Sequence, residues 1–365
     1  MQTRVVMLAD FDYFFAQCEE LRNPQIKDKP IVVGVYSGRT EESGAVSTSN
    51  YIARKYGVKS GMPLFLAKRK LEGTEAVFFK VDHEYYDQIS DRIMQILRTY
   101  ATSLEQVSVD EAYLDVTEQV EGSFEVAREY AQKIKADVKA QVGISFTIGV
   151  GPNKIVAKIA CDSQKPDGLT IVKPHDAQVF LEPLEVGCLL GVGKKTSVKM
   201  AEMGIKTISD LAKYDCQRLI EVFGRALGIY FHNAANAVDN EPVQEQGEAE
   251  SISRIGTLKQ DTRDLEFILQ KTNELTEDVY RDLTKRGLSF KLVSIYAVNV
   301  DLSSKSRSTT LEQPAKDQET IKKNTKTLFE KYLAESSLGI RRVGVRVSAF
   351  SKEEPKQKQL SSFFL

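Results

Sequence analysis

The chain has 365 residues, of which 42% are hydrophobic and 28% are charged, which is typical of a globular protein too long for a single core. Its apolar runs, such as 5–9 and 31–35, are far shorter than a membrane span, and the N-terminal residues lack the apolar core of an export signal. The net charge is −1, but residues 285–352 hold 14 Lys and Arg against 6 Asp and Glu, a net of +8 that leaves −9 elsewhere and predicts a basic module joined to an acidic body.

The first half of the chain alternates between patterns of strands and helices. Helix 152–162 begins with a proline at its favoured first turn, and the Gly/Ser/Thr-rich segment 42–49 precedes a short helix that ends at Gly57. This alternation predicts an α+β or α/β body. Predicted strands cover 4–11, 30–36, 105–109, 112–116 and 145–150, and predicted helices cover 14–21, 50–55, 84–100, 123–142 and 152–162.

The second half changes character twice. From 174 to about 237 the strands disappear, and short helices with glycine turns replace them. The acidic, polar segment 239–251 contains a proline, so we interpret it as an interdomain linker. A βαββαβ-like module is predicted beyond it, with helices over 264–284 and 320–334 and strands over 291–300 and 341–350.

Acidic residues stand at the ends of two apolar strands. Asp10 follows the run Val5–Ala9, where a carboxylate has no packing role, and Asp110 and Glu111 are adjacent acids flanked by apolar residues. Such charges are costly to bury unless a cation neutralises them. Converging carboxylates suit Mg²⁺, and two such ions roughly 3.5–4 Å apart can promote an in-line phosphoryl transfer.

The competing interpretation treats Asp110 and Glu111 as solvated, inert residues at a hairpin tip. It would be preferred for an isolated acidic pair. With two acid-bearing strands in one chain, the residues favour the two interpretations about equally. Neighbouring residues of a strand point to opposite faces. These two side chains therefore share a site only if the chain turns between them, or if one reaches a metal edge-on.

Five motifs carry a resemblance to a known family. They are LADFDYFFAQ (8–17), SGAVSTSNYIARKYGVKSGMP (43–63), SVDEAYLD (108–115), GVGPNKIVAKIA (149–160) and KPDG (165–168). In this order and spacing they closely resemble the Y-family DNA polymerases, in the DinB or DNA polymerase IV branch, with archaeal members the most similar. The resemblance covers about residues 4–350.

The resemblance implies an α+β right-hand polymerase fold with an additional DNA-binding domain. The implied parts are a palm (1–13 and 82–172), fingers (14–81), a helical thumb with a helix–hairpin–helix (173–238), a linker (239–251), a little finger (252–350) and a tail (351–365). The implied activity is low-fidelity, translesion synthesis on a primer–template, in which the primer 3′-hydroxyl attacks the α-phosphate of a dNTP.

The same resemblance assigns roles to the acidic residues. Asp10 and Asp110 match the aspartates that hold two Mg²⁺ ions, and Glu111 matches the third catalytic carboxylate. Phe11 would lend its backbone carbonyl to a metal.

A nucleotide-binding set is implied beside the metals. Tyr51 and Arg54 match residues that touch the incoming triphosphate, and their i, i+3 spacing places a phenol and a guanidinium on one helix face, although an exposed amphipathic helix would look the same. Lys165 matches a lysine that reaches the β- and γ-phosphates, whereas a lone loop lysine is ordinarily only solvated. The set is completed by Tyr13, Phe14 and Thr48.

Phe15 occupies the sugar-discriminating position of the family, where many members carry Tyr. A flat ring at this position would clash with a ribose 2′-hydroxyl and favour deoxynucleotides. The alternative is a core phenylalanine on the helix 14–21.

The segment 189–205 has the hydrophobic-Gly-hydrophobic-Gly turn of a helix–hairpin–helix. Gly191 and Gly193 would let backbone amides approach a DNA phosphate, and Lys194 and Lys195 would add charge, although a plain glycine turn between helices is the alternative.

In the basic module, Arg341 and Arg342 are the predicted DNA contacts.

Residues 357–364 match a peptide that docks on sliding clamps. One helical turn would gather Leu360, Phe363 and Phe364 into an apolar plug behind Gln357. Burial of this plug within the protein itself is the alternative.

The cysteines and histidines define the expected compartment. The 4 cysteines have no paired spacing and the 3 histidines are scattered, which argues against zinc and disulfides and fits a reducing cytoplasm. We expect a monomer without membrane contact.

Two other functions compete with polymerisation. Related carboxylate-bearing sheets serve metal-dependent nucleases and nucleotide cyclases, but a cyclase has no use for a thumb, a basic module or a clamp peptide, and no separate acidic cluster marks an exonuclease. The second alternative is an inactive scaffold that binds DNA and a clamp. Intact Asp10, Asp110 and Glu111 argue against it.

Overall fold

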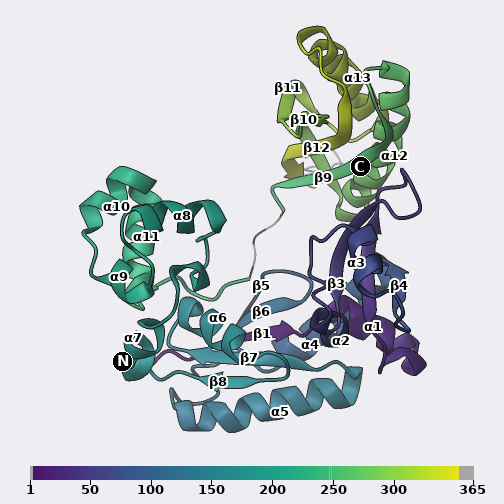
Figure 1. Ribbon diagram of the computed structural model, residues 1–365. Coiled ribbons are helices and arrows are strands. Elements are labelled where there is room, and N and C mark those ends of the chain that lie inside the picture. The colour runs from purple at the N-terminus through teal and green to yellow at the C-terminus, as the bar shows by residue number, and fades with distance from the viewer. Residues whose placement is uncertain (1–2, 246, 248, 353–365) are drawn as a thin grey trace, which may run out of the picture. The chain divides into compact units, whose positions relative to one another are not determined.

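The computed structural model describes residues 3–245, 247 and 249–352 (Figure 1). These residues form two compact units. The first draws on residues up to 34, on 46–60 and on residues from 70 to the acidic segment, and the second draws on 35–45, 61–69 and residues beyond 246.

A five-stranded sheet in the order β5-β6-β1-β7-β8 organises the first unit. The apolar strand β1 lies in its middle and pairs antiparallel with β6 and β7, while β5 pairs antiparallel with β6 and β8 pairs parallel with β7. The strands are β1 (Val6–Phe11), β5 (Ser103–Gln106), β6 (Glu111–Asp115), β7 (Phe146–Gly151) and β8 (Leu169–Ile171).

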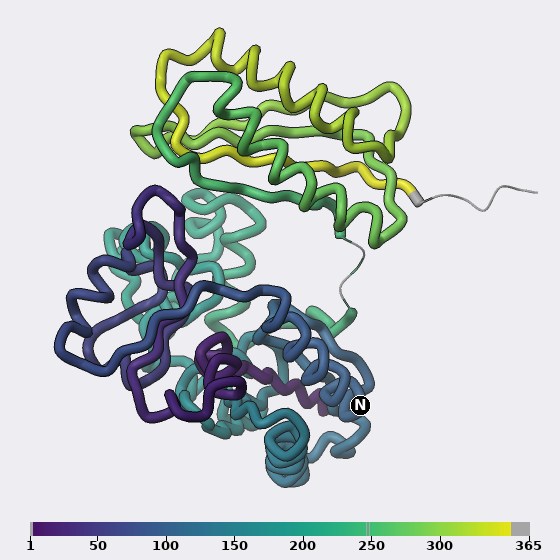
Figure 2. Tube along the Cα trace, turned by 90° about the vertical axis from the view of Figure 1, so that its right-hand side faces the viewer, coloured from purple at the N-terminus to yellow at the C-terminus, as the bar shows by residue number. Residues whose placement is uncertain are grey.

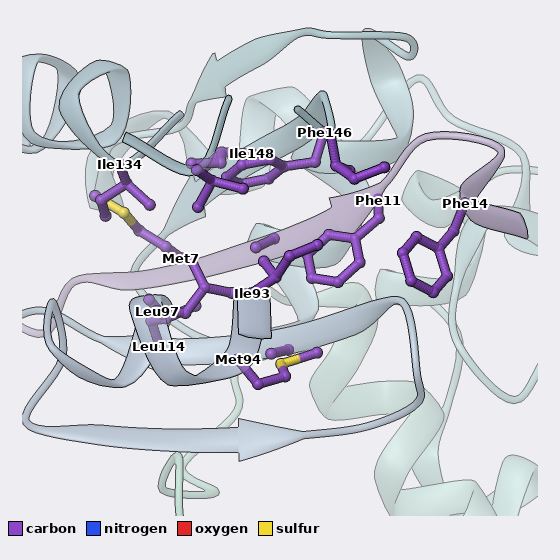
Figure 3. Packing of buried hydrophobic residues seen from close by; sticks show 14 of the residues in the cluster. Met7, Phe11, Phe14, Ile93, Met94, Leu97, Leu114, Ile134, Phe146 and Ile148 are labelled. Carbon is purple, nitrogen blue, oxygen red and sulfur yellow. The ribbon is translucent and has the colours of Figure 1, made fainter. Parts of the chain in front are cut away.

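Alternation along β1 divides its side chains between two layers. Met7, Ala9 and Phe11 belong to the main core, where they pack with residues of α4 (His83–Arg98) and α5 (Phe124–Val142) (Figure 3). Val6 and Leu8 point the other way and pack with residues of α6 (Lys154–Ser163). Asp10 shares the parity of Val6 and Leu8, so β1 directs its carboxylate to the α6 side.

Local signals in the sequence fix the ends of the helices that cover this sheet. Asp82, Ser123 and Asn153 are the N-caps of α4, α5 and α6, and each side chain accepts a backbone N–H from the first turn of its helix. Gly143 ends α5 with a left-handed backbone at φ 86°.

The remaining elements before residue 237 are short. A small sheet has the order β3-β2-β4, in which β2 and β4 are parallel. Its neighbourhood holds α1 (Phe14–Arg22), η1 (Pro24–Ile26), β2 (Ile31–Tyr36), β3 (Gly44–Ser49), α2 (Tyr51–Lys55), α3 (Leu64–Lys70) and β4 (Val77–Lys80). The helical segment after β8 comprises η2 (Pro174–Asp176), α7 (Ala177–Leu181), η3 (Val186–Cys188), α8 (Lys194–Glu202), α9 (Ile208–Ala212), α10 (Cys216–Phe223) and α11 (Arg225–Ala235).

The second unit contains the predicted βαββαβ order. Its antiparallel sheet has the order β11-β10-β12-β9, and its path from green to yellow can be followed in Figure 2. Apolar residues of both helices join those of the sheet in one core. The elements are β9 (Ser251–Thr262), α12 (Leu265–Arg286), β10 (Leu288–Asn299), β11 (Ser304–Ala315), α13 (Gln318–Glu335) and β12 (Ile340–Lys352).

Several elements differ from the sequence prediction. The segment 42–49 contains the strand β3, where Gly44 permits an approach so close that a Cβ would lie 2.3 Å from the carbonyl oxygen of Val35. Strands β9 and β11 are largely exposed and polar, so they lack the apolar alternation on which the prediction depended. The short elements α3, β4 and β8 were also not predicted.

The acidic segment after α11 packs against the first unit. Val243 is 5% exposed and belongs to the small core on the α6 side of the sheet. Lys154 pairs with the Glu241 carboxylate at 3.1 Å, and Arg4 donates to the Glu241 carbonyl. Its first residues are therefore anchored to the sheet rather than extended in solvent.

Candidate active site

The pairing of β1 with β6 sets two of the three predicted carboxylates side by side. Asp10 and Glu111 are direct partners in this ladder, so their side chains point to the same face of the sheet. Asp110 precedes β6 in a bend, and its carbonyl accepts the N–H of Phe11 at 2.8 Å. The chain therefore bends at Asp110, immediately before Glu111 begins β6.

A pocket of about 340 Å³ gathers most of the predicted site residues. The exception among the metal and nucleotide predictions is Glu111, which lines a neighbouring pocket of about 690 Å³ that also includes Lys158. The smaller pocket is lined by Asp10, Phe11, Asp12, Tyr13, Phe14, Phe15, Ser47, Thr48, Tyr51, Arg54, Ser60, Val109, Asp110 and Lys165.

Two lysines lie among these carboxylates. Lys158, from α6, contacts Glu111 and lies 3.4 Å from Asp10 Oδ2. Lys165 Nζ lies 2.5 Å from the same Asp10 oxygen and 2.8 Å from Asp162 Oδ1. The ammonium groups therefore neutralise part of the negative charge that the fold collects at this edge of the sheet.

Burial and pairing act in opposite directions on these groups. Burial lowers the pKa of Lys158 and Lys165, but the hydrogen bonds and attraction of the nearby carboxylates outweigh it, so both pKa values are raised. Burial raises the pKa of Glu111, and the hydrogen bond from Lys158 only partly offsets this. Both lysines are consequently charged at neutral pH.

The oxygen-rich donor set fits a divalent cation. The contacts with Ser108, Lys158 and Lys165 engage one oxygen each of Asp110, Glu111 and Asp10, and carboxylate oxygens are the ligands that hard cations prefer. Within residues 3–245, 247 and 249–352, however, no three His, Cys, Asp or Glu side chains are grouped as a metal-binding set. The described arrangement is that of carboxylates held by ammonium groups.

Tyr51 and Arg54 share one face of α2, as their spacing predicts. The Arg54 guanidinium lies 4.5 Å from the centre of the Tyr51 ring, and its Nε donates to Ser49 O at 2.9 Å. Tyr13 also contacts Tyr51 edge-on, with the two ring centres 5.5 Å apart. Asn50 caps α2 by accepting the N–H of Ala53 at 3.0 Å, which fixes where this helix begins.

Phe15 packs against the core and also lines the smaller pocket. Its ring stacks on buried Tyr86 with centroids 4.5 Å apart, and it also lines the smaller pocket. His83 approaches its ring edge-on at 6.0 Å. Phe14, by contrast, is 2% exposed and packs on Phe11 in the core, so little of its ring can reach a ligand.

The predicted helix–hairpin–helix has the expected local geometry. Gly191 adopts a left-handed backbone at φ 83°, and Gly193 is the N-cap of α8. Lys194 and Lys195 follow in the first helical turn, and both are exposed. The amide groups and the positive end of α8 are thus presented with two lysines, which is suited to an anion such as a DNA phosphate.

The predicted arginines of β12 have different surroundings. Arg342 is exposed, whereas Arg341 is half-buried and lies 3.6 Å from Asp261. Arg346, which the sequence prediction omitted, shares the face of Arg342 because the two are four residues apart on one strand. Tyr296 is the cross-strand neighbour of Gly344 on that face and is 40% exposed.

Three residues near the carboxylates were absent from the predicted site: Lys158, Asp162 and Asp12. The spacing of Lys154, Lys158 and Asp162 along α6 would have placed them on one face, which is the signal that could have found two of the three. Asp12 stands within a quoted motif, but nothing in the sequence shows which groups it meets. The predicted clamp-binding residues Gln357, Leu360, Phe363 and Phe364 lie outside the described residues.

No helix in the described part of the chain is both long and apolar enough to cross a bilayer.

Family models match three stretches of the chain. The impB/mucB/samB family matches residues 9–162, its C-terminal domain matches 249–361, and a thumb domain described for DNA polymerase-iota matches 188–239.

Archaeal relatives match nearly the whole chain. A DNA polymerase IV of Nitrosopumilus maritimus is 44% identical over 365 residues, covering 100% of both chains. A DNA polymerase IV of Saccharolobus solfataricus is 37% identical over 343 residues, covering 94% of this chain and 95% of its own. Among solved structures, a Y-family DNA polymerase chimera of Dbh and Dpo4 is 36% identical with a TM-score of 0.90, covering 96% of this chain and 100% of its own. An insertion ternary complex of Dbh DNA polymerase has the same identity and coverage, 36%, 96% and 100%, with a TM-score of 0.69.

Proposed function

The chain belongs to the Y-family DNA polymerases of the archaeal DNA polymerase IV (DinB) type, and we propose that it performs low-fidelity, translesion synthesis by two-metal-ion nucleotidyl transfer. It is a DNA-directed DNA polymerase by family. The observation that supports this chemistry best is the smaller pocket, in which Asp10 and Asp110 share walls with Tyr51, Arg54 and Lys165.

In the proposed reaction, the primer 3′-hydroxyl attacks the α-phosphate of a dNTP and pyrophosphate leaves. Asp10, Asp110 and Glu111, with the carbonyl of Phe11, would hold two Mg²⁺ ions. When bound, these ions lower the pKa of the attacking hydroxyl and stabilise charge on the phosphate oxygens. The remaining groups of the site act on the triphosphate.

The triphosphate would be bound by the cationic side of the pocket. The Arg54 guanidinium, stacked on Tyr51, offers a fork of donors to phosphate oxygens. Lys165 requires its charged form for the β- and γ-phosphates, and attraction to Asp10 raises its pKa against the effect of burial. Thr48 and Tyr13 line the same space, and the Phe15 ring would face the sugar.

We assign primer–template DNA to two surfaces. One is the turn at Gly191 and Gly193 with Lys194 and Lys195, and the other is the open sheet face that carries Arg342 in the basic module. Neither needs to read bases, because contacts to phosphates supply most sequence-independent affinity. We also propose that the chain divides into the palm, fingers, thumb and little finger that the resemblance implies.

A single primer-extension experiment tests the function. Purified protein with Mg²⁺, the four dNTPs and a primer–template is expected to lengthen the primer and to continue past a damaged template base. Shortened primers would indicate a nuclease, conversion of a free nucleotide to a cyclic product would indicate a cyclase, and DNA binding without any product would indicate a scaffold. Each of these three outcomes contradicts the proposal.

We propose that Gln357, Leu360, Phe363 and Phe364 bind a sliding clamp. Replacing both phenylalanines by Ala is expected to remove stimulation by an archaeal-type clamp and to leave clamp-free extension unchanged. A peptide this short buries few apolar groups and must be ordered on binding, so we expect micromolar affinity. Tethering raises the local concentration of enzyme on DNA, so the clamp should lengthen the product made per encounter.

Measuring product length with and without clamp, for both proteins, checks this prediction. Lower thermal stability and lower clamp-free activity in the double variant would instead mean that the phenylalanines pack within the protein itself.

We also infer a monomer working in a reducing cytoplasm. All four cysteines have free thiols, and Cys18 and Cys161 are buried in the first unit. This supports a compartment in which disulfides do not form.

A further inference from the structure

Asp12 is a buried carboxylate with a specific set of partners. It is 1% exposed, although it directly follows the metal-site residues Asp10 and Phe11 in the chain. Its Oδ1 accepts the hydroxyl of Thr147 at 2.9 Å, and its Oδ2 accepts the backbone N–H of Asp167 at 2.8 Å. Burial of a carboxylate is costly unless hydrogen-bond donors compensate it. The two donors of Thr147 and Asp167 supply that compensation for Asp12.

These donors belong to, or support, the turn 165–168 that carries Lys165. The Thr147 hydroxyl oxygen also accepts the N–H of Gly168 at 3.3 Å, so Asp12 and Thr147 together hold two consecutive amides of the turn. The carbonyl side of the turn is held separately. Lys135, from α5, donates to the carbonyls of Asp167 at 2.7 Å and Gly168 at 2.9 Å.

The backbone of the turn 165–168 is closely constrained by its neighbours. A Cβ at Gly168 would lie 1.9 Å from the carbonyl oxygen of Gln164, so the chain closes tightly on itself at this point. The N–H of Ile148 in β7 also donates to the Gly168 carbonyl at 3.1 Å, which ties the turn to the central sheet.

We propose that Asp12 is a positioning residue, which acts on the reaction through Lys165. Asp12 lies two residues after Asp10, and its carboxylate accepts the backbone N–H of Asp167, which lies two residues after Lys165. The hydrogen bond between Asp12 and Asp167 therefore joins the segment that carries Asp10 to the turn that carries Lys165, whose ammonium lies 2.5 Å from the Asp10 carboxylate. Because both oxygens of Asp12 are engaged by donors, it holds the lysine in place rather than binding metal or substrate itself.

This proposal rests on the proposed polymerase function, and its test separates the two. In Asp12→Asn, one acceptor oxygen becomes an NH₂ group, which cannot accept from Thr147 or Asp167. The Lys165 ammonium is then less well placed, and we expect KM for dNTP to rise roughly tenfold, as for loss of one hydrogen bond to a charged group. The value of kcat should change much less, and Asp91→Asn, at an exposed site on α4, is the matched control.

The decisive measurement is a double-mutant cycle with Lys165→Ala. If Asp12 acts through Lys165, Asp12→Asn adds no further rise in KM once the lysine is gone. The same comparison with Thr147→Val and Thr147→Ser provides a second route if Asp12→Asn does not fold. Val removes the hydroxyl and should reproduce the rise, whereas Ser retains the hydroxyl and should restore native KM.

The outcomes are distinct. A full tenfold rise in the Lys165→Ala background, or equal losses of dNTP and primer–template affinity, would overturn the positioning role and leave the polymerase function standing. Absence of primer extension by the native protein would instead overturn the proposed function.

Discussion

Asp110→Ala is expected to abolish primer extension while primer–template binding stays within a few-fold of that of the native protein. The proposed metal ions contribute several kcal/mol of charge stabilisation to the transition state, so losing a ligand should lower kcat by on the order of 10³-fold or more. Binding survives because contacts to DNA phosphates elsewhere dominate affinity. Single-turnover extension and a DNA-binding titration on the same preparation measure the two effects.

Asp110 gives a cleaner test than Asp10. The Asp110 carboxylate accepts a hydrogen bond from the nearby Ser108 hydroxyl at 2.5 Å, so its loss disturbs little of the fold. Asp10 is contacted by the ammonium groups of Lys158 and Lys165, so removing it would take one carboxylate partner from each of two part-buried lysines. Extension at a near-native rate by Asp110→Ala, with Asp91→Ala as the control, would end the assignment of this carboxylate to the metals.

Phe15→Ala is expected to raise incorporation of ribonucleotides far more than it lowers the use of deoxynucleotides. The ring lines the pocket and stacks on Tyr86 with ring centres 4.5 Å apart. This packing should hold the ring rigidly where it would clash with a 2′-hydroxyl. One pocket contact commonly changes discrimination by about 1–3 kcal/mol, which is roughly 10- to 200-fold in the ratio of kcat/KM for dNTP over rNTP. Steady-state kinetics with matched nucleotide pairs gives this ratio directly.

Phe15→Tyr is the matched control for that prediction. It keeps the aromatic ring and should keep the native ratio, whereas Ala also leaves a gap beside Tyr86 that costs some stability. If Phe15→Ala loses activity equally with both sugars, the ring is a packing residue and the sugar is selected elsewhere.

Local patterns in the sequence predict the strands that carry the acidic residues. Asp10 follows an apolar run within β1 and Glu111 begins the apolar strand β6, while the helix caps at Ser123 and Asn153 set the covering helices. The βαββαβ order also follows from helix-length periodicity, although the polar strands β9 and β11 carry no apolar alternation of their own.

Groups that act across long sequence separations could not be predicted in this way. Lys158 reaches Asp10 over 148 positions, and Asp12 meets Asp167 over 155. A lone lysine or aspartate carries no periodicity that would identify such a partner. Only the packing of α6 and of the turn 165–168 against the sheet brings these groups together.

The cross-strand placement of Asp10 and Glu111 has a consequence for how such an enzyme can diversify. Their spacing is imposed by backbone pairing between β1 and β6, whereas Phe15 and Arg54 stand on the separate short helices α1 and α2. With the roles proposed above, exchanges on those helices are expected to change which nucleotides are accepted, while the pairing of β1 with β6 keeps Asp10 and Glu111 in place. Evolution, or a designer, can alter selectivity on this scaffold without rebuilding its chemistry.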